Sequence, residues 1–176
     1  MDNSDTFYIT ELELEDAFSV HQLMVNNKMH FRAYLPVTLS QNLSLSASED
    51  YIILKKKENK ASAALTFALK EKETKEVCGL IILKNIDTVK KQGEFAFGLG
   101  KEYCGRGWMS QAVKVFSLYA HNELLLKKLQ IITHKTNIGS SKVAKKNGYI
   151  WQRSLKNEYT PPKQGSLDME LYELTL

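Results

Sequence analysis

The segment 104–109 reads Cys-Gly-Arg-Gly-Trp-Met, and these residue types could bind an anion through the backbone. Glycine allows close approach and positive φ, and Arg106 adds a positive charge. A helical pattern follows at once over 108–122, and a helix N-terminus offers unpaired N–H groups and a partial positive charge. Together these features predict a phosphate site. The alternative is a strand-to-helix turn in which glycine only relieves backbone strain.

A second junction of the same kind, TNIGSSKVAKKNGY over 136–149, follows the predicted strand 128–135. Two neighbouring parallel strands would aim both helix N-termini at one edge of a sheet, where ligands commonly bind. Gly98 and Gly100 in the preceding strand predict a bulge or bend that parts the two strands and opens a cleft. The glycines match neither a P-loop nor a complete dinucleotide fingerprint, so neither nucleotide-binding fold is indicated.

The elements that must position these junctions follow from hydrophobic periodicity and turn residues. The strand–helix–strand unit in the centre requires a crossover and therefore a parallel pair, whereas the remaining strands can be antiparallel. This order predicts a mixed α/β sheet. The predicted strands are 7–14, 64–70, 77–86, 93–99, 128–135, 149–159 and 166–175, the last two joined by a Pro-Pro-Lys-Gln-Gly turn. The predicted helices are 16–27, a short stretch closed by Leu35-Pro36, about 48–59 with a capping box at Ser46, 108–122, and 140–149 closed by Gly148.

Composition places the chain among ordinary globular proteins. Its 176 residues suit one domain, 1–176, and 43% of them are hydrophobic and 25% charged. No apolar run approaches the roughly 18 residues of a membrane span, and the polar N-terminus resembles no targeting segment. Cys78 and Cys104 have no metal-ligand spacing, which predicts a reduced cytoplasmic protein without a metal. The net charge of +4 is spread among mixed Lys and Glu, so direct nucleic-acid binding is not expected.

The two junctions together resemble the GNAT superfamily of N-acetyltransferases, and most closely its RimJ/RimL-like branch, which acetylates ribosomal-protein N-termini. The segment EFAFGLGKEYCGRGWMSQA (94–112) resembles the pyrophosphate-binding motif of that branch, and NIGSSKVAKKNGY (137–149) resembles its second pattern. The resemblance implies the GNAT fold, a mostly antiparallel twisted sheet of about seven strands with one splayed parallel pair and about four helices. It also implies transfer of an acetyl group from acetyl-CoA directly to a primary amine, above all a protein N-terminal amine.

The resemblance also assigns roles to individual residues. Ser140 would act in catalysis by donating its hydroxyl proton toward the leaving sulfur, although a serine at this place can instead cap the helix. The backbone of Phe97 and Leu99 would pair with pantetheine as an added strand, and Lys142 or Lys145 could neutralise phosphate. The full set implied to bind the cofactor is Phe97, Leu99, Cys104, Gly105, Arg106, Gly107, Trp108, Met109, Asn137 and Ser140.

The resemblance also implies that Glu158 is the general base and a second catalytic residue, because the branch places an acidic residue near the acceptor in this region. His134 at the end of a parallel strand and a water relay are the alternatives. No His or Asp is tied to Cys104, so a nucleophilic cysteine is not expected.

The sequence departs from the family in ways that leave the acceptor open. Gly98 stands where the branch often has a large aromatic, and Ala144 where many members carry a catalytic Tyr. The remaining alternatives are acetylation of a polyamine, aminoglycoside or amino acid, and a non-catalytic CoA-binding module. A third, a ribosome-associated RNA-binding protein, predicts salt-sensitive RNA binding. A homodimer is compatible with the branch.

Overall fold

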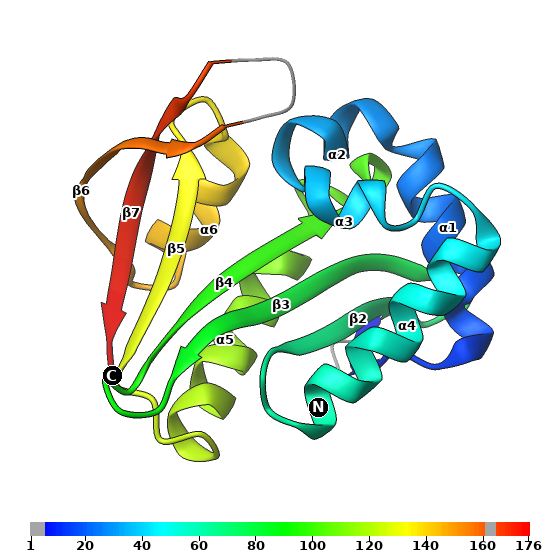
Figure 1. The fold of residues 1–176 in the computed structure, drawn as a ribbon, viewed down its shortest axis with the longest axis horizontal. Helices are drawn as coiled ribbons and strands as arrows, with labels where there is room; N and C mark the ends of the chain where they lie inside the picture. Colours follow the sequence, from blue (N-terminus) through cyan, green and yellow to red (C-terminus); the bar gives the residue numbers. More distant parts are fainter. Residues whose placement is uncertain (1–5, 161–164) are drawn as a thin grey trace.

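The chain is built on a sheet whose strands separate along part of its length. A computed structural model describes residues 6–160 and 165–176, and within them the strands form a seven-stranded sheet in the order β1-β2-β3-β4-β5-β7-β6 (Figure 1). The strands are β1 (Phe7–Glu11), β2 (Leu65–Glu71), β3 (Val77–Asp87), β4 (Gln92–Leu99), β5 (Lys128–His134), β6 (Ile150–Tyr159) and β7 (Leu167–Thr175). In that part of the chain only β4 and β5 pair in parallel. The predicted mixed sheet is confirmed, while residues 161–164 of the turn predicted at 161–165 lie outside the described residues.

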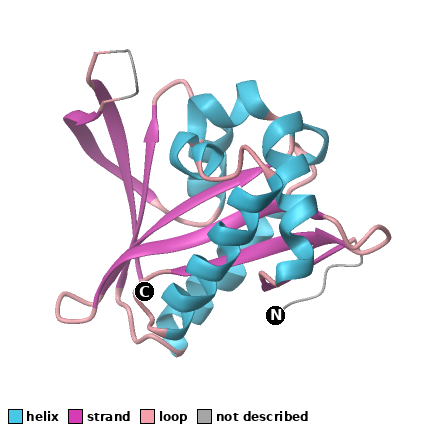
Figure 2. Cartoon of the chain, turned by 45° about the vertical axis from the view of Figure 1, so that its right-hand side comes forward, coloured by secondary structure: helices cyan, strands magenta, loops and turns pink. Residues whose placement is uncertain are grey.

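Helices cover both faces of the sheet. Those of the described chain are α1 (Ala17–Asn26), α2 (Lys28–Tyr34), α3 (Pro36–Ser40), α4 (Leu45–Lys60), α5 (Trp108–Asn122) and α6 (Ile138–Lys146). Helices α1 to α4 lie over one face and α5 over the other (Figures 1 and 2). The breaks at Asn27 and Leu35 agree with the predicted helix ends, but α3 was not predicted: Pro36 does not merely end α2 but begins α3, in the first-turn position that proline favours.

Two helices begin earlier than their patterns predicted. Helix α4 starts after Ser44, whose hydroxyl accepts a backbone N–H at 3.2 Å, so the cap predicted at Ser46 is wrong. Helix α6 starts after Asn137, whose Oδ1 accepts the N–H of Ser140 at 3.1 Å. Gly148, which follows α6, has φ +79°, as predicted for a left-handed residue at a helix end.

A hydrophobic cluster lies on each face of the sheet. Under α1 to α4 it includes Val20, Met24 and Phe31, and on the α5 side it includes Phe95 and Phe116, all at most 1% exposed. Burying each such side chain contributes about 1.5–3 kcal/mol to stability. The two clusters therefore fix α2 and α5 on opposite sides of β4.

Strands β4 and β5 pair only at their beginnings, over Gln92–Phe95 and Lys128–Ile131, and both then continue unpaired with each other. The predicted splayed pair is confirmed. Of the bulge or bend predicted at Gly98 and Gly100, a bulge at Gly98 is absent, because β4 stays in register with β3 through Leu80↔Gly98 and Gly79↔Leu99. Gly98 serves close packing instead: a Cβ there would lie 2.8 Å from the buried Phe31 ring.

The substitution Gly98→Ala is expected to destabilise the fold by about 1–3 kcal/mol, since the added methyl forces Phe31 and Leu35 to move. For a chain of this size the melting temperature should fall by roughly 2–12 °C in a thermal denaturation followed by circular dichroism. Gly139→Ala is the control, because its nearest contact would be an ordinary 3.6 Å. Equal melting temperatures for both variants would contradict the packing role.

Candidate functional site

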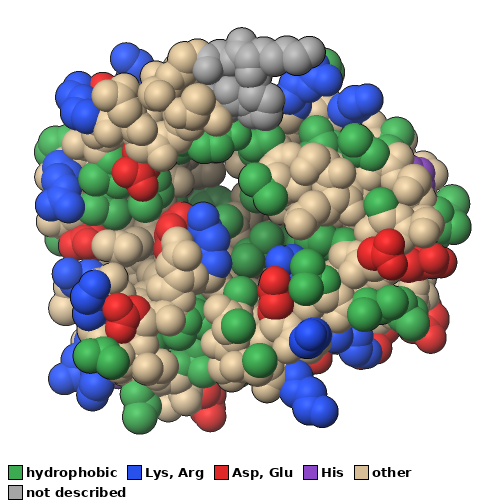
Figure 3. Space-filling view, in the orientation of Figure 1, with side chains coloured by type: hydrophobic (Ala, Val, Ile, Leu, Met, Phe, Trp, Pro, Cys, Tyr) green, Lys and Arg blue, Asp and Glu red, His purple; other side chains and the backbone are tan. Residues whose placement is uncertain are grey.

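A cavity of about 340 Å³ lies where β4 and β5 part. Its walls come from both faces of the sheet: α2 and Leu35 on one side, the starts of α5 and α6 on the other, and β4 between them. The space-filling view from the α1–α4 side is hollowed near its centre, between those helices and the block of β5, β6 and β7 (Figure 3). The lining residues are His30, Phe31, Tyr34, Leu35, Phe97, Gly98, Leu99, Cys104, Gly105, Gly107, Trp108, Met109, Ser110, Asn137, Gly139, Ser140, Lys142, Val143 and Lys146.

One edge of β4 is unpaired along this cavity. The hydrogen bonds of the opposite edge, which pairs with β3, tell which residues face the cavity. In an antiparallel pair, alternate residues turn both N–H and C=O toward the partner strand. Gly100 donates its N–H to the Cys78 carbonyl at 2.9 Å, so the even-numbered residues of β4 face β3. Phe97 and Leu99 therefore face the β5 side, where strand pairing has already ended at Phe95. Their backbone groups present a short unpaired strand edge to an extended ligand.

The loop into α5 presents backbone donors. Within the described chain, the backbone N–H groups of residues 105–110 donate to no acceptor. Gly105 and Gly107 have φ +81° and +83°, and a Cβ on either would meet nothing within 4 Å. Both glycines line the cavity, so they are required for backbone conformation and leave open space in front of the donors. Unpaired N–H groups at a helix start with open space before them make an anion site.

Trp108 and Met109 belong to both the core and the cavity wall. They are 6% and 5% exposed, and the Trp108 ring stacks on Phe7 with centroids 5.2 Å apart. Cys104 also lines the cavity, but burial and then the Glu102 carboxylate raise the pKa of its thiol, so it stays protonated near neutral pH.

Arg106 does not line the cavity. Its guanidinium lies 5.3 Å from the Tyr103 and Trp108 ring centroids, and it donates to the Glu102 carbonyl at 3.0 Å. The cationic side chains on the wall are instead Lys142 and Lys146 of α6. Lys145 is not among them. Because residues four apart share a helix face, Lys146 could have been found from Lys142 by its spacing.

The start of α6 distinguishes its two neighbouring serines. Asn137 caps the helix, so the alternative in which Ser140 is the cap is wrong. The Ser141 hydroxyl donates to the Ile138 carbonyl at 3.1 Å. The Ser140 hydroxyl has no partner among the described residues and lines the cavity. Ser140 is thus the serine whose proton is available to a ligand.

Neither predicted base lines the cavity. Glu158 is exposed on β6, beside Asn157, where the register with β7 shifts. His134 bonds through Nδ1 to the Thr136 hydroxyl at 2.7 Å. Neither side chain therefore contributes to the cavity wall that holds Ser140, and Ala144, at the position of the missing Tyr, is fully buried.

Sequence reasoning missed the wall supplied by α2. His30 lies 5.4 Å from the Phe31 ring and 5.5 Å from the Tyr34 ring, centroid to centroid. Burial lowers the pKa of its imidazole below the ordinary 6.5, and the charge of Lys101 lowers it further. His30 is therefore neutral at pH 7. No motif marks this helix, because packing across the sheet alone brings it to the glycine-rich loop.

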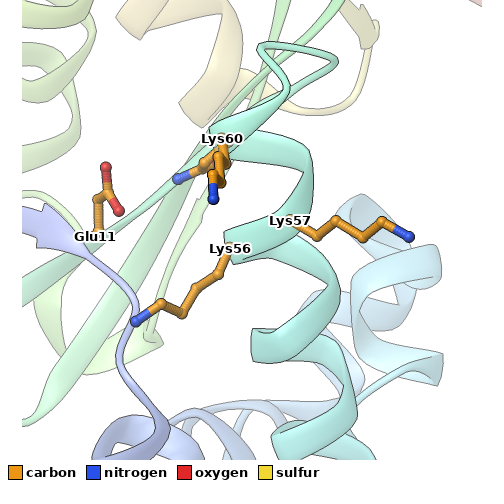
Figure 4. Close-up of a pocket in the computed structure, with 5 residues that line it drawn as sticks. Glu11, Lys56, Lys57 and Lys60 are labelled. Atoms are coloured by element: carbon orange, nitrogen blue, oxygen red, sulfur yellow. The ribbon is translucent and has the colours of Figure 1, made fainter.

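A second hollow, of about 550 Å³, lies between the end of β1 and α4 and is lined by Glu11, Lys56, Lys57, Asn59 and Lys60. None of the predicted site residues lines it. Lys56 is paired with Glu13, and Lys57 is directed away from Glu11 (Figure 4). Its mixed, exposed charges give it the character of ordinary solvated surface.

The comparisons with known proteins agree on one family. A family model described as "Acetyltransferase (GNAT) domain" matches residues 7–150. YdaF of Bacillus subtilis is 31% identical over 74 residues, which span 42% of this chain and 40% of its own length. The spermidine N(1)-acetyltransferase of Escherichia coli K12 is 28% identical over 159 residues, covering 90% of this chain and 81% of that protein.

Solved structures share the fold at low sequence identity. The ribosomal-protein-S5-alanine acetyltransferase of Vibrio fischeri superimposes with a TM-score of 0.91 at 18% identity, covering 99% of this chain and 95% of the other. RimL, a ribosomal L7/L12 α-N-protein acetyltransferase solved in complex with coenzyme A, superimposes with a TM-score of 0.89 at 17% identity. The match covers 98% of this chain and 96% of the RimL chain. In the described residues of this chain, no helix is both long and apolar enough to cross a membrane.

Proposed function

The chain belongs to the GNAT acetyltransferase family, and we propose that it transfers the acetyl group of acetyl-CoA to a primary amine, specifically a protein N-terminal amine. The observation that carries the proposal is the cavity at the parted strands, with unpaired backbone donors at the start of α5 and along β4. The proposal also places the protein in the cytoplasm. The two free thiols of the chain, Cys78 and Cys104, fit that reducing compartment.

The backbone donors of the cavity support one orientation for acetyl-CoA. The N–H groups of 105–110 would hold its diphosphate, with Lys142 and Lys146 adding positive charge. The pantetheine arm would pair with the backbone of Phe97 and Leu99 as a partial strand. Arg106 lies against aromatic rings in this structure, so its contact with phosphate stays a prediction.

Ser140 would then serve the leaving group. When the amine nitrogen attacks the thioester carbon, the C–N bond forms and the C–S bond breaks. The departing sulfur needs a proton, and the Ser140 hydroxyl lines the cavity without another partner in the described chain. The Ser140 hydroxyl would pass a proton from the tetrahedral intermediate to the sulfur and end unchanged.

Charge on the walls favours an N-terminal amine over a polyamine. Lys142 and Lys146 line the cavity, whereas no Asp or Glu among the described residues does. A polycation such as spermidine would find no carboxylate on the wall to pair with its further ammonium groups. The spermidine enzyme among the relatives keeps a small-molecule amine as the second candidate. A peptide with a free N-terminus and no Lys or Arg needs no such partner beyond its one amine.

Two measurements test the proposal. At a hundredfold excess over its dissociation constant, acetyl-CoA should stabilise the chain by about 2.7 kcal/mol and raise its melting temperature by roughly 5–11 °C. Thiol release should then depend on added amine, with a peptide bearing a free N-terminal Ala at least tenfold above spermidine in kcat/KM. Stabilisation without amine-dependent release would indicate a non-catalytic CoA-binding module. No stabilisation would overturn both functions, and a preference for spermidine would overturn the proposed acceptor.

A further inference from the structure

The four histidines of the chain fall into two groups. His21 bonds through Nδ1 to the Asn42 carbonyl at 3.2 Å, His121 to the Leu126 carbonyl at 3.1 Å, and His134 to Thr136. His30 alone has no hydrogen-bond partner for either ring nitrogen within 6–160 and 165–176. It is also the one histidine on the cavity wall in that part of the chain.

The wall that carries His30 lies opposite the cofactor side. Helix α2 belongs to the hydrophobic cluster on one face of the sheet, whereas α5 and Ala144 of α6 belong to the cluster on the other. The unpaired donors of 105–110 and the Ser140 hydroxyl are on that second side. A thioester held along β4 would thus reach the parted strands with Ser140 on its own side and His30 on the acceptor's side.

The other groups on the wall are poor proton acceptors at neutral pH. Lys142 and Lys146 are ammonium groups, and burial raises the pKa of the Cys104 thiol so that it is no ready thiolate. Tyr34 is a phenol, and no carboxylate lines the cavity in the described residues. The groups that face His30 are the Tyr34 ring and the Lys101 charge from the loop after β4.

We propose that His30 is the general base that removes the first proton from the acceptor ammonium. This inference rests on the proposed acetyltransferase function. The bound amine enters as R–NH3⁺, and the His30 imidazole takes one proton and passes it to solvent. The freed nitrogen pair attacks the thioester carbon, and the C–S bond breaks as the tetrahedral intermediate collapses. A second amine proton reaches the sulfur through Ser140, giving the amide and free thiol. The overall reaction releases one proton.

The test is the pH dependence of kcat at saturating acetyl-CoA and N-terminal-Ala peptide. Protonated His30 cannot accept a proton, so wild-type kcat should fall as pH drops through a midpoint below 6.5. His30→Gln should lower plateau kcat about 10²-fold and remove this acid limb. His30→Ala should regain activity with added imidazole, a rescue that a merely structural role would not give. The His30 proton resonance should titrate with the same midpoint.

His121→Gln is the matched control, since His121 is hydrogen-bonded at the end of α5 and does not line the cavity. Glu158→Gln tests the carboxylate predicted from sequence. An acid limb that persists in His30→Gln, or is lost in Glu158→Gln instead, overturns His30 as the base and leaves the transferase intact. A wild-type chain that binds acetyl-CoA but acetylates no amine overturns both. The acetyl-CoA melting shift should be the same in every variant.

Discussion

The substitution Gly107→Val is expected to weaken acetyl-CoA binding about 10³-fold, corresponding to about 4 kcal/mol. Gly107 has φ +83°, where a β-branched residue is strained by about 1–3 kcal/mol. Relief of that strain rotates the N–H groups of 105–110 away from the phosphate. Each charge-assisted hydrogen bond lost costs a further 1.5–3 kcal/mol, roughly. Isothermal titration calorimetry at a temperature where the variant is folded measures the change.

The matched control for this effect is Gly148→Val. Gly148 has φ +79°, and its Cβ would meet Leu174 at an ordinary 3.7 Å, so the backbone strain is similar. It follows α6 and does not line the cavity. Both variants should lose similar stability, but only Gly107→Val should lose affinity. Equal affinities in the two variants would place the diphosphate elsewhere.

The substitution Ser140→Ala is expected to lower kcat about 10³-fold, because the thiolate then leaves without a proton donor. Acetyl-CoA affinity should stay within about threefold of wild type, since the backbone contacts are untouched. Pre-steady-state measurement of thiol release separates this chemical step from product release.

Ser141→Ala supplies the comparison on the next residue. The Ser141 hydroxyl already bonds to the helix backbone and is absent from the wall, so kcat should change less than about threefold. If the two serine variants were equally active, a water molecule rather than Ser140 would protonate the sulfur.

The sequence predicted the part of the site formed by β4, β5 and α5 well, because the patterns that mark these elements are local in the sequence. The apolar stripe that follows Gly107 predicts helix 108–122, and α5 spans those same residues. The predicted parting of β4 and β5 is confirmed, although the bulge at Gly98 offered as its cause is absent. The fold class followed from element order, because a parallel pair needs a crossover.

What the sequence could not predict depends on packing between distant segments. His30 lines the cavity from α2, whose neighbouring Phe31 and Leu35 lie close against β4 at Gly98. Arg106 turned from the cavity to the Tyr103 and Trp108 rings, where cation–π contact competes with the expected phosphate. Local patterns carry no information on either outcome. The helix start at Ser44 was missed because several serines in 44–48 can serve as caps.

The cavity takes its walls from both faces of the sheet, and this arrangement predicts the order of events in catalysis. Under the proposed function, acetyl-CoA would bind beside α5 and α6 and the acceptor amine beside α2, so each could bind while the other is present. Both substrates could then be bound in one ternary complex, and the acetyl group would pass directly between them without an acyl-enzyme intermediate. Steady-state velocities at varied concentrations of each should accordingly give intersecting rather than parallel double-reciprocal lines.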